Sequence, residues 1–216
     1  MANYKEEARM FAPLESQGTG REYMSVAEYF AREETAVEKH EYRDGYRYPR
    51  HAGPHAFEAM AGARESHVRL GMRLSRFIGQ HLEDSPCIPY AADMRLAPNE
   101  RAYFYPDLFV TCHPATGPTV LVQRDAILVV EITSPGTEGD DRGDKFHQYQ
   151  QLPSLREYLI LSAEELHADL FRRGPEGLWV LHPVGPDDEL VLENISFHLP
   201  MNLLYQGVEL HGGASA

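Results

Sequence analysis

The chain has 216 residues, of which 43% are hydrophobic and 25% charged, and its formal net charge is −13. This composition suits one globular domain with its own core, and the lack of any run of about 18 apolar residues excludes a membrane-spanning helix. So acidic a chain also lacks the overall basic surface with which proteins bind DNA tightly and without regard to sequence.

The chain ends and the cysteines suggest how the chain is organised. Residues 1–22 lack hydrophobic periodicity and an apolar signal segment, so we expect a flexible arm there and no secretory signal. The folded domain is expected over 23–207, followed by a flexible tail over 208–216. Cys87 and Cys112 are only two, so we expect no disulfide framework and a location in the reducing cytoplasm.

A short helix and a hairpin are the first elements expected in the domain. Ser25 can cap a helix over 26–32, with Glu28 completing a capping box. Asp44-Gly45 lies between two alternating segments, which predicts a hairpin over 39–49.

The rest of the chain predicts a sheet with helices packed on it. Apolar residues at helical spacing predict a long helix over 66–83, after a loop that ends at residue 64. The later expected elements are strands at 87–97, 103–112, 119–123 and 126–133, a helix from about 140 to 152, a strand at 156–162 and a hairpin of 166–172 with 177–184. This order predicts an α/β (α+β) fold, in which helices flank a mixed sheet.

A carboxylate lies in the most apolar segment of the chain, Ile127–Ile132, which reads as a strand covered on both faces. Glu131 there needs a cation or a hydrogen-bond donor, because an unpaired buried charge costs several kcal/mol. Asp107 follows Pro106 in a nearby strand-like segment that can pair antiparallel with the first. Alone, Asp107 could equally be a turn aspartate; opposite Glu131 it predicts a divalent-cation site.

The oxygen ligands of this pair favour a hard cation. Asp107 and Glu131, completed by the backbone carbonyl of Ile132, suit Mg²⁺ or Mn²⁺. Neither cysteine flanks the pair at the spacing of a ligand for a softer metal.

A lysine on the following helix can reach the same place. Asp141, Lys145 and Tyr149 or Gln148 share one face of the expected helix. Because this helix begins soon after the strand of Glu131, Lys145 could orient or deprotonate a water there, or stabilise charge on a phosphate. A solvated helix face with an acid–base pair is the alternative.

Several short motifs, in this order, carry a resemblance to a known family. They are Glu41-Tyr42-Arg43-Asp44-Gly45, His67, Pro106-Asp107, Glu131-Ile132-Thr133-Ser134-Pro135 with Thr137, then Asp141, Lys145 and Tyr149, and Arg156-Glu157-Tyr158-Leu159-Ile160. Over about residues 24–205 the chain resembles the Uma-two family of restriction-endonuclease-like proteins (domain of unknown function 820), part of the PD-(D/E)xK nuclease superfamily.

The resemblance implies a restriction-endonuclease-like sheet, with Asp107 and Glu131 as metal ligands and Glu41 as a further acid of the site. The superfamily usually has a lysine two residues after the glutamate; here that position is Thr133, and Lys145 stands in for it. His67 matches a family histidine, with a structural role as its alternative, and Glu41 could instead be a solvent-facing hairpin residue.

Two functions remain open on this reading. One is a metal-dependent endonuclease that hydrolyses DNA phosphodiester bonds, expected to act as a homodimer because two sites must address two strands. The other is a catalytically inactive nuclease fold that serves in binding or assembly, which the −13 charge and Thr133 favour. A metal-independent hydrolase finds no support, since the chain has no Gly-x-Ser-x-Gly nucleophile motif.

Overall fold

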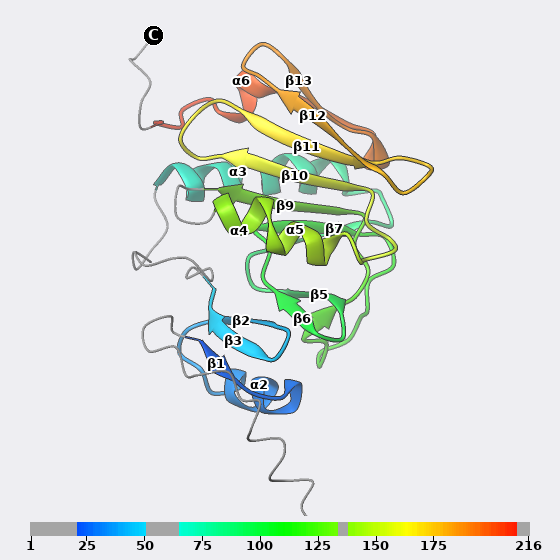
Figure 1. Ribbon diagram of the computed structural model, residues 1–216. Coiled ribbons are helices and arrows are strands. Elements are labelled where there is room, and N and C mark those ends of the chain that lie inside the picture. The colour runs from blue at the N-terminus through cyan, green and yellow to red at the C-terminus, as the bar shows by residue number, and fades with distance from the viewer. Residues whose placement is uncertain (1–20, 51–64, 134–137, 211–216) are drawn as a thin grey trace, which may run out of the picture.

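The computed structural model describes residues 21–50, 65–133 and 138–210, which form two six-stranded sheets, a two-stranded sheet and the helices around them (Figure 1). The predicted loop at 50–64, apart from Arg50, and nearly all of the predicted N-terminal arm lie outside these residues, as does the tail beyond residue 210. No helix in the described ranges is long and apolar enough to cross a membrane.

The N-terminal sheet contains the predicted hairpin, and its strands run in the order β1-β3-β2-β6-β5-β8. The hairpin turns at Asp44 and Gly45, whose φ angles of 50° and 95° are both positive, as the tight turn of a two-residue hairpin requires. Helix α2 (Val26–Glu33) packs beside it, and Ser25 with Glu28 forms the predicted capping box. The strands of this sheet are β1 (Glu22–Tyr23), β2 (His40–Arg43), β3 (Tyr46–Pro49), β5 (Arg95–Asn99), β6 (Ala102–Phe104) and β8 (Val122–Gln123).

The central sheet runs in the order β12-β11-β10-β9-β7-β4 and is mixed, as predicted. Strand β9 is parallel to β10 and antiparallel to β7, and all six of its residues are buried. The strands are β4 (Ile88–Ala91), β7 (Leu108–Thr111), β9 (Leu128–Thr133), β10 (Glu157–Ser162), β11 (Ala168–Arg173) and β12 (Trp179–Val184).

Helices cover the two faces of the central sheet (Figure 1). On one face, α3 (Glu65–His81) buries Leu70, Leu74 and Ile78 in a core shared with the small pair β13 (Glu189–Leu192) and β14 (Phe197–Pro200). The turn η1 (Glu193–Ile195) and helix α6 (Met201–Leu204) complete this layer. On the other face, α4 (Glu138–Arg142) and α5 (Asp144–Tyr149) lie against β9 and β10.

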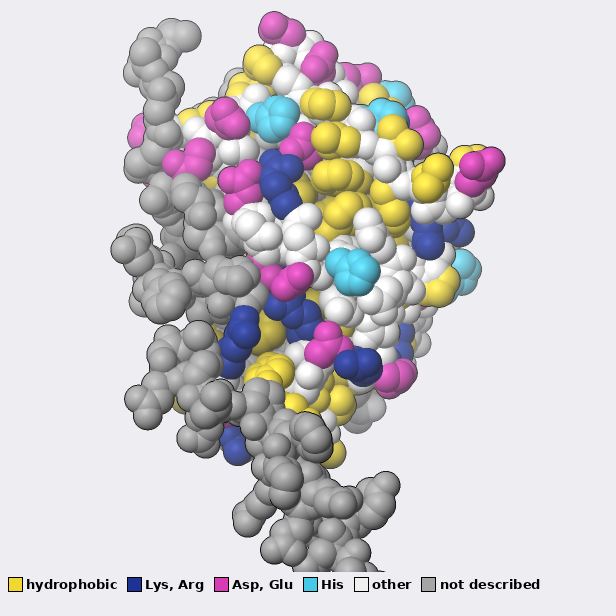
Figure 2. All heavy atoms as spheres, in the orientation of Figure 1, with side chains coloured by type: hydrophobic (Ala, Val, Ile, Leu, Met, Phe, Trp, Pro, Cys, Tyr) yellow, Lys and Arg dark blue, Asp and Glu magenta, His cyan; other side chains and the backbone are white. Residues whose placement is uncertain are grey.

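Strand β12 lies at one edge of the central sheet. Hydrophobic side chains gather on the surface in that region of the molecule (Figure 2), and Leu178, Val180 and Leu181 are among the exposed ones.

Two predicted strands are each divided between the two sheets. The segment 87–97 forms β4 and β5, separated by a turn at Ala92, whose φ is 50°. The segment 103–112 forms β6 and β7, separated at Pro106, which has no N–H to continue a ladder. The chain therefore crosses between the sheets directly before Asp107. The predicted helix at 140–152 is likewise divided at Gly143, into α4 and α5.

The two cysteines, for which no disulfide framework was expected, form one disulfide, Cys87–Cys112, that the sequence did not predict. Strands β4 and β7 are antiparallel, with Ile88 opposite Thr111. Cys87, which precedes Ile88, therefore lies opposite Cys112, which follows Thr111. This pairing register joins residues that are 25 positions apart.

Candidate functional site

Asp107 stands opposite Glu131, as predicted. The ladder of β7 and β9 pairs Leu108 with Val130, and one step further along it places Asp107 across from Glu131. Oδ2 of Asp107 accepts a hydrogen bond from the backbone N–H of Ile132 at 2.8 Å. Opposite positions of neighbouring strands share a face of the sheet. The carboxylates of Asp107, directly after the crossing at Pro106, and of Glu131 therefore lie on the same side of the sheet.

Glu131 is 3% exposed and is held from helix α5. Its Oε1 accepts a hydrogen bond from the Tyr149 hydroxyl at 3.0 Å and lies 3.6 Å from Nζ of Lys145. Burial raises the pKa of Glu131 well above its ordinary value, although Lys145 opposes this effect.

Lys145 is the shared cation of three carboxylates. Its Nζ lies 3.4 Å from Glu41, 3.4 Å from Asp141 and 3.6 Å from Glu131. Burial by itself lowers the pKa of Lys145, but these carboxylates outweigh burial and hold the pKa well above its usual value. The lysine is therefore a fixed positive charge, and the alternative of a solvated helix face is wrong.

Glu41 reaches this cluster from strand β2 of the N-terminal sheet. It is fully buried, so the alternative of a solvent-facing hairpin residue is also wrong. Its Oε1 accepts the backbone N–H of Tyr105 at 3.0 Å, while its buried Oε2 bonds to no atom of the described residues. Burial raises the pKa of Glu41, against the opposing charge of Lys145.

Two further cationic groups contact Asp107. Nη2 of Arg50 and Nε2 of His67 each lie 3.2 Å from its Oδ1. Burial would raise the pKa of Asp107, but His67, the Ile132 N–H and Arg50 outweigh it, so the pKa is lowered. The pKa of His67 is raised in turn, because Asp107 outweighs the burial of the imidazole.

Arg50 and Tyr105 are the residues that sequence reasoning missed. Arg50 fell at the start of a predicted loop, and its place directly after the hairpin was the available signal. Tyr105 precedes Pro106-Asp107, so its position next to the motif could have suggested it.

Two of the predicted accessory residues lie elsewhere. Thr133 donates its hydroxyl to the carbonyl of Leu161 at 3.3 Å and lines a separate cavity at the end of β9. Gln148 also lines a different cavity, where its Nε2 donates to Asp44 at 3.4 Å. Neither contributes to the lining of the space between Asp107 and Glu131.

We call that space the carboxylate cavity; its volume is about 30 Å³, and its lining residues are Arg50, His67, Tyr105, Asp107, Glu131, Ile132, Asp141 and Lys145. This volume matches one water molecule or one small ion. In a strand, the N–H and C=O of one residue point in the same direction. Because the Ile132 N–H points toward Asp107, to which it donates, the Ile132 carbonyl also points toward that side of β9.

This donor set fits Mg²⁺. Magnesium prefers oxygen ligands and commonly binds through one or two carboxylates, keeping several waters. In the described part of the chain, no three His, Cys, Asp or Glu side chains form a group that could hold a metal. The two carboxylates and the Ile132 carbonyl can supply only part of an octahedral shell, so the other ligands of a bound ion would come from outside the carboxylate cavity, whose volume matches the ion alone.

Known proteins share this sequence pattern and this fold. A family model described as "Uma2: Putative restriction endonuclease" matches residues 26–202. Two uncharacterized proteins of Synechocystis are similar, one 33% identical over 86% of this chain and 93% of its own length, the other 30% identical over 73% and 85%. A crystal structure from Anabaena variabilis, titled as a putative nuclease of the DUF820 family, superimposes with a TM-score of 0.64 at 11% identity, over 79% of this chain and 91% of that one.

Proposed function

This chain belongs to the Uma2 family of restriction-endonuclease-like proteins, and from that membership we propose that it is a Mg²⁺- or Mn²⁺-dependent endonuclease that hydrolyses phosphodiester bonds in DNA. One observation carries the proposal. Asp107, Glu131 and Lys145, from two strands and a helix, converge on one cavity the size of an ion.

The metal would be held by the carboxylates of Asp107 and Glu131 and by the carbonyl of Ile132. A divalent cation there supplies Lewis-acid stabilisation of the phosphate and lowers the pKa of a bound water. Tyr149 fixes Glu131 by its hydrogen bond, and the Ile132 N–H fixes Asp107, so both ligands are positioned before an ion arrives.

Lys145 and Arg50 supply positive charge on the two sides of the carboxylates. Lys145, held as an ammonium by three carboxylates, can orient the attacking water and offset charge that develops on the phosphate. Arg50 and His67, bonded to Oδ1 of Asp107, can turn toward a phosphate oxygen when that carboxylate binds a metal.

The test is cleavage of supercoiled plasmid with Mg²⁺ or Mn²⁺. We expect nicked and linear products from the wild type and none in EDTA. Asp107→Asn should lower the rate by about 10³-fold, because it removes an interaction worth about 4 kcal/mol in the transition state. Lys145→Ala should also lower the rate, whereas exposed Asp84→Asn serves as a matched control with the wild-type rate. Equal residual cleavage in all variants would identify a contaminant and refute the proposal.

A catalytically inactive nuclease fold, kept for binding or assembly, is the second candidate. The contacts of Arg50 and His67 with Asp107 favour it, since the protein's own cations already satisfy the ligand oxygen. Calorimetric titration with Mn²⁺ distinguishes the two. Saturable binding that Asp107→Asn abolishes supports the enzyme, and no binding at millimolar Mn²⁺ supports the inactive fold.

The proposal includes a homodimer, because cleavage of both strands needs two sites facing antiparallel backbones. Light scattering at micromolar concentration should give about twice the chain mass of 24.5 kDa. A mass equal to that of one chain would remove this part of the proposal.

A further inference from the structure

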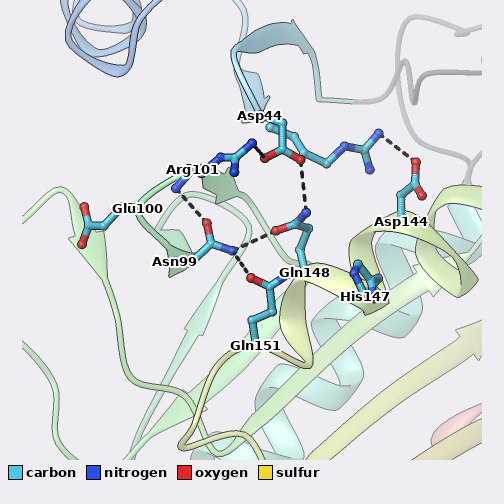
Figure 3. A pocket seen from close by; sticks show the side chains of 9 residues that line it. Asp44, Asn99, Glu100, Arg101, Asp144, His147, Gln148 and Gln151 are labelled. Atoms are coloured by element: carbon cyan, nitrogen blue, oxygen red, sulfur yellow. Dashed lines mark hydrogen bonds and ion pairs between the residues drawn. The ribbon is translucent and has the colours of Figure 1, made fainter.

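A second and much larger cavity is lined in part by helix α5. We call it the carboxamide cavity; it has a volume of about 640 Å³ (Figure 3). Strand β2 with its turn, the turn after β5, and helix α5 contribute its lining, which consists of Arg43, Asp44, Asn99, Glu100, Arg101, Asp144, His147, Gln148 and Gln151.

Helix α5 lines both cavities, and strand β2, which lines the carboxamide cavity, also carries Glu41, an ion-pair partner of Lys145. On β2, Arg43 is two residues beyond Glu41 and so lies on the same face, about 6.6 Å further along the strand. On α5, Gln148 is three residues beyond Lys145, which is about 4.5 Å along the axis. A chain bound at the carboxylates therefore reaches the carboxamide cavity within a short step.

Three side-chain amides form a hydrogen-bonded network in this cavity (Figure 3). Nδ2 of Asn99 donates to Oε1 of Gln148 at 2.8 Å and to Oε1 of Gln151 at 3.0 Å. Oδ1 of Asn99 accepts the backbone N–H of Arg101 at 2.7 Å, which sets the orientation of the amide. Gln151 is exposed, and its Nε2 donates to no atom of the described residues, so both N–H donors and one lone pair of this cavity-lining amide are unused.

The charges around the network do not favour an anion. Arg101 pairs with Asp44 at 2.8 Å and Arg43 with Asp144 at 3.2 Å. Since Glu100 adds a third carboxylate against these two arginines, the lining carries no excess of positive charge. A phosphate would find its cations already paired, whereas a neutral group with hydrogen-bonding edges would not be repelled.

We propose that the carboxamide cavity binds a nucleobase of the DNA strand being cut, and that Gln151 recognises adenine there. An amide side chain can accept from N6 of adenine and donate to N7 at the same time. The inference rests on the proposed nuclease function, whose substrate preference it specifies. Because stacked bases are about 3.4 Å apart, the recognised base lies within about three nucleotides of the scissile phosphate.

The experiment measures binding of the full-length protein to single strands by fluorescence anisotropy in EDTA, so that no cleavage occurs. The probes are twelve-nucleotide thymine strands with A, C, G or T at one central position. We expect the strand with adenine to bind about tenfold more tightly, within the discrimination that one bidentate contact provides. Gln151→Ala should remove this preference, and Gln150→Ala, the same change at a neighbour that does not line the cavity, should keep it.

Equal affinity for all four strands, absence of binding to any of them, or a preference that survives Gln151→Ala would each overturn the inference. A second assay, cleavage of a random duplex library in Mn²⁺, distinguishes failure of this inference from failure of the proposed nuclease function. Selective binding without cleavage would refute the proposed nuclease activity and support the base-binding site. Cleavage with no base preference beside the cut would refute the base-binding site and support the proposed nuclease activity.

Discussion

The carboxylate cavity and the carboxamide cavity share helix α5, yet they are built in opposite ways. The first has a volume of about 30 Å³ and is surrounded by buried ionisable groups that share their counter-charges. The second has a volume of about 640 Å³, and its amides and paired charges reach the surface. Buried charges are stable only as a complete set, whereas an exposed amide can change partners at little cost. The first arrangement suits chemistry at a fixed point and the second suits recognition.

The largest expected effect comes from removing the shared cation of the carboxylate cavity. Lys145→Met leaves three buried carboxylates without it, and breaking a buried ion pair on one side costs about 3–5 kcal/mol. Urea denaturation should show this loss. The exposed pair of Lys39 with Asp93 provides the matched control, because Lys39→Met should cost less than about 1 kcal/mol.

The double variant Lys145→Met/Glu131→Gln sharpens this test. It removes one of the buried charges left unpaired, so it should be more stable than Lys145→Met alone. With the single variant Glu131→Gln the three form a double-mutant cycle, and additive losses of stability would mean that Glu131 and Lys145 are not energetically coupled and that the cavity does not behave as a set.

Removing the disulfide should lower the stability of the sheet without changing the carboxylate cavity. Cys87→Ser/Cys112→Ser should lower the free energy of unfolding by about 3.5 kcal/mol, the chain-entropy value for closing a loop of 25 residues. Asp107 lies at the opposite end of the β4–β7 ladder, so Mn²⁺ affinity should stay within about threefold of the wild type. Wild type treated with reductant should match the variant. Titration of two free thiols per chain in unreduced, denatured protein would contradict the bond.

Arg43 lines the carboxamide cavity, and its loss should have an intermediate effect. Its guanidinium binds Asp140 at 3.1 Å and Asp144 at 3.2 Å and lies over the Tyr48 ring. Arg43→Met should cost about 2 kcal/mol, the range for hydrogen bonds to charged groups that are largely buried. Arg101→Met, at a side chain that is 75% exposed, should cost less than about 1 kcal/mol. Equal costs would mean that burial does not distinguish these arginines.

The sequence predicted those parts of the fold that depend on local pattern. The apolar run around Glu131 identified β9, and Asp44-Gly45 identified the hairpin, because each signal lies within a few residues. The turn at Ala92 was missed, since a left-handed residue other than glycine or asparagine gives no clear signal. The disulfide was missed because the register of β4 and β7 depends on contacts between distant segments.

The candidate site shows the same division. Asp107 and Glu131 were predicted as a pair from strand order, and the register places them opposite each other. The burial of Glu41 could not be derived from its own strand, because the N–H of Tyr105 and the ammonium of Lys145 come from elsewhere in the chain. Arg50 contacts Asp107 across 57 positions, a contact that no local pattern indicates.

The smallest expected effect on stability tests the other half of the comparison. Gln151→Ala removes an exposed amide that accepts one hydrogen bond from Asn99, so the free energy of unfolding should change by less than about 0.5 kcal/mol. The related change Asn99→Ala removes the donor that holds both Gln148 and Gln151 and should cost about 1 kcal/mol. Urea denaturation of both variants measures the difference. A loss above 2 kcal/mol for Gln151→Ala would mean that the amide supports the fold. The carboxamide cavity would then be a structural network like the carboxylate cavity, and it would have no unused hydrogen-bonding groups for a ligand.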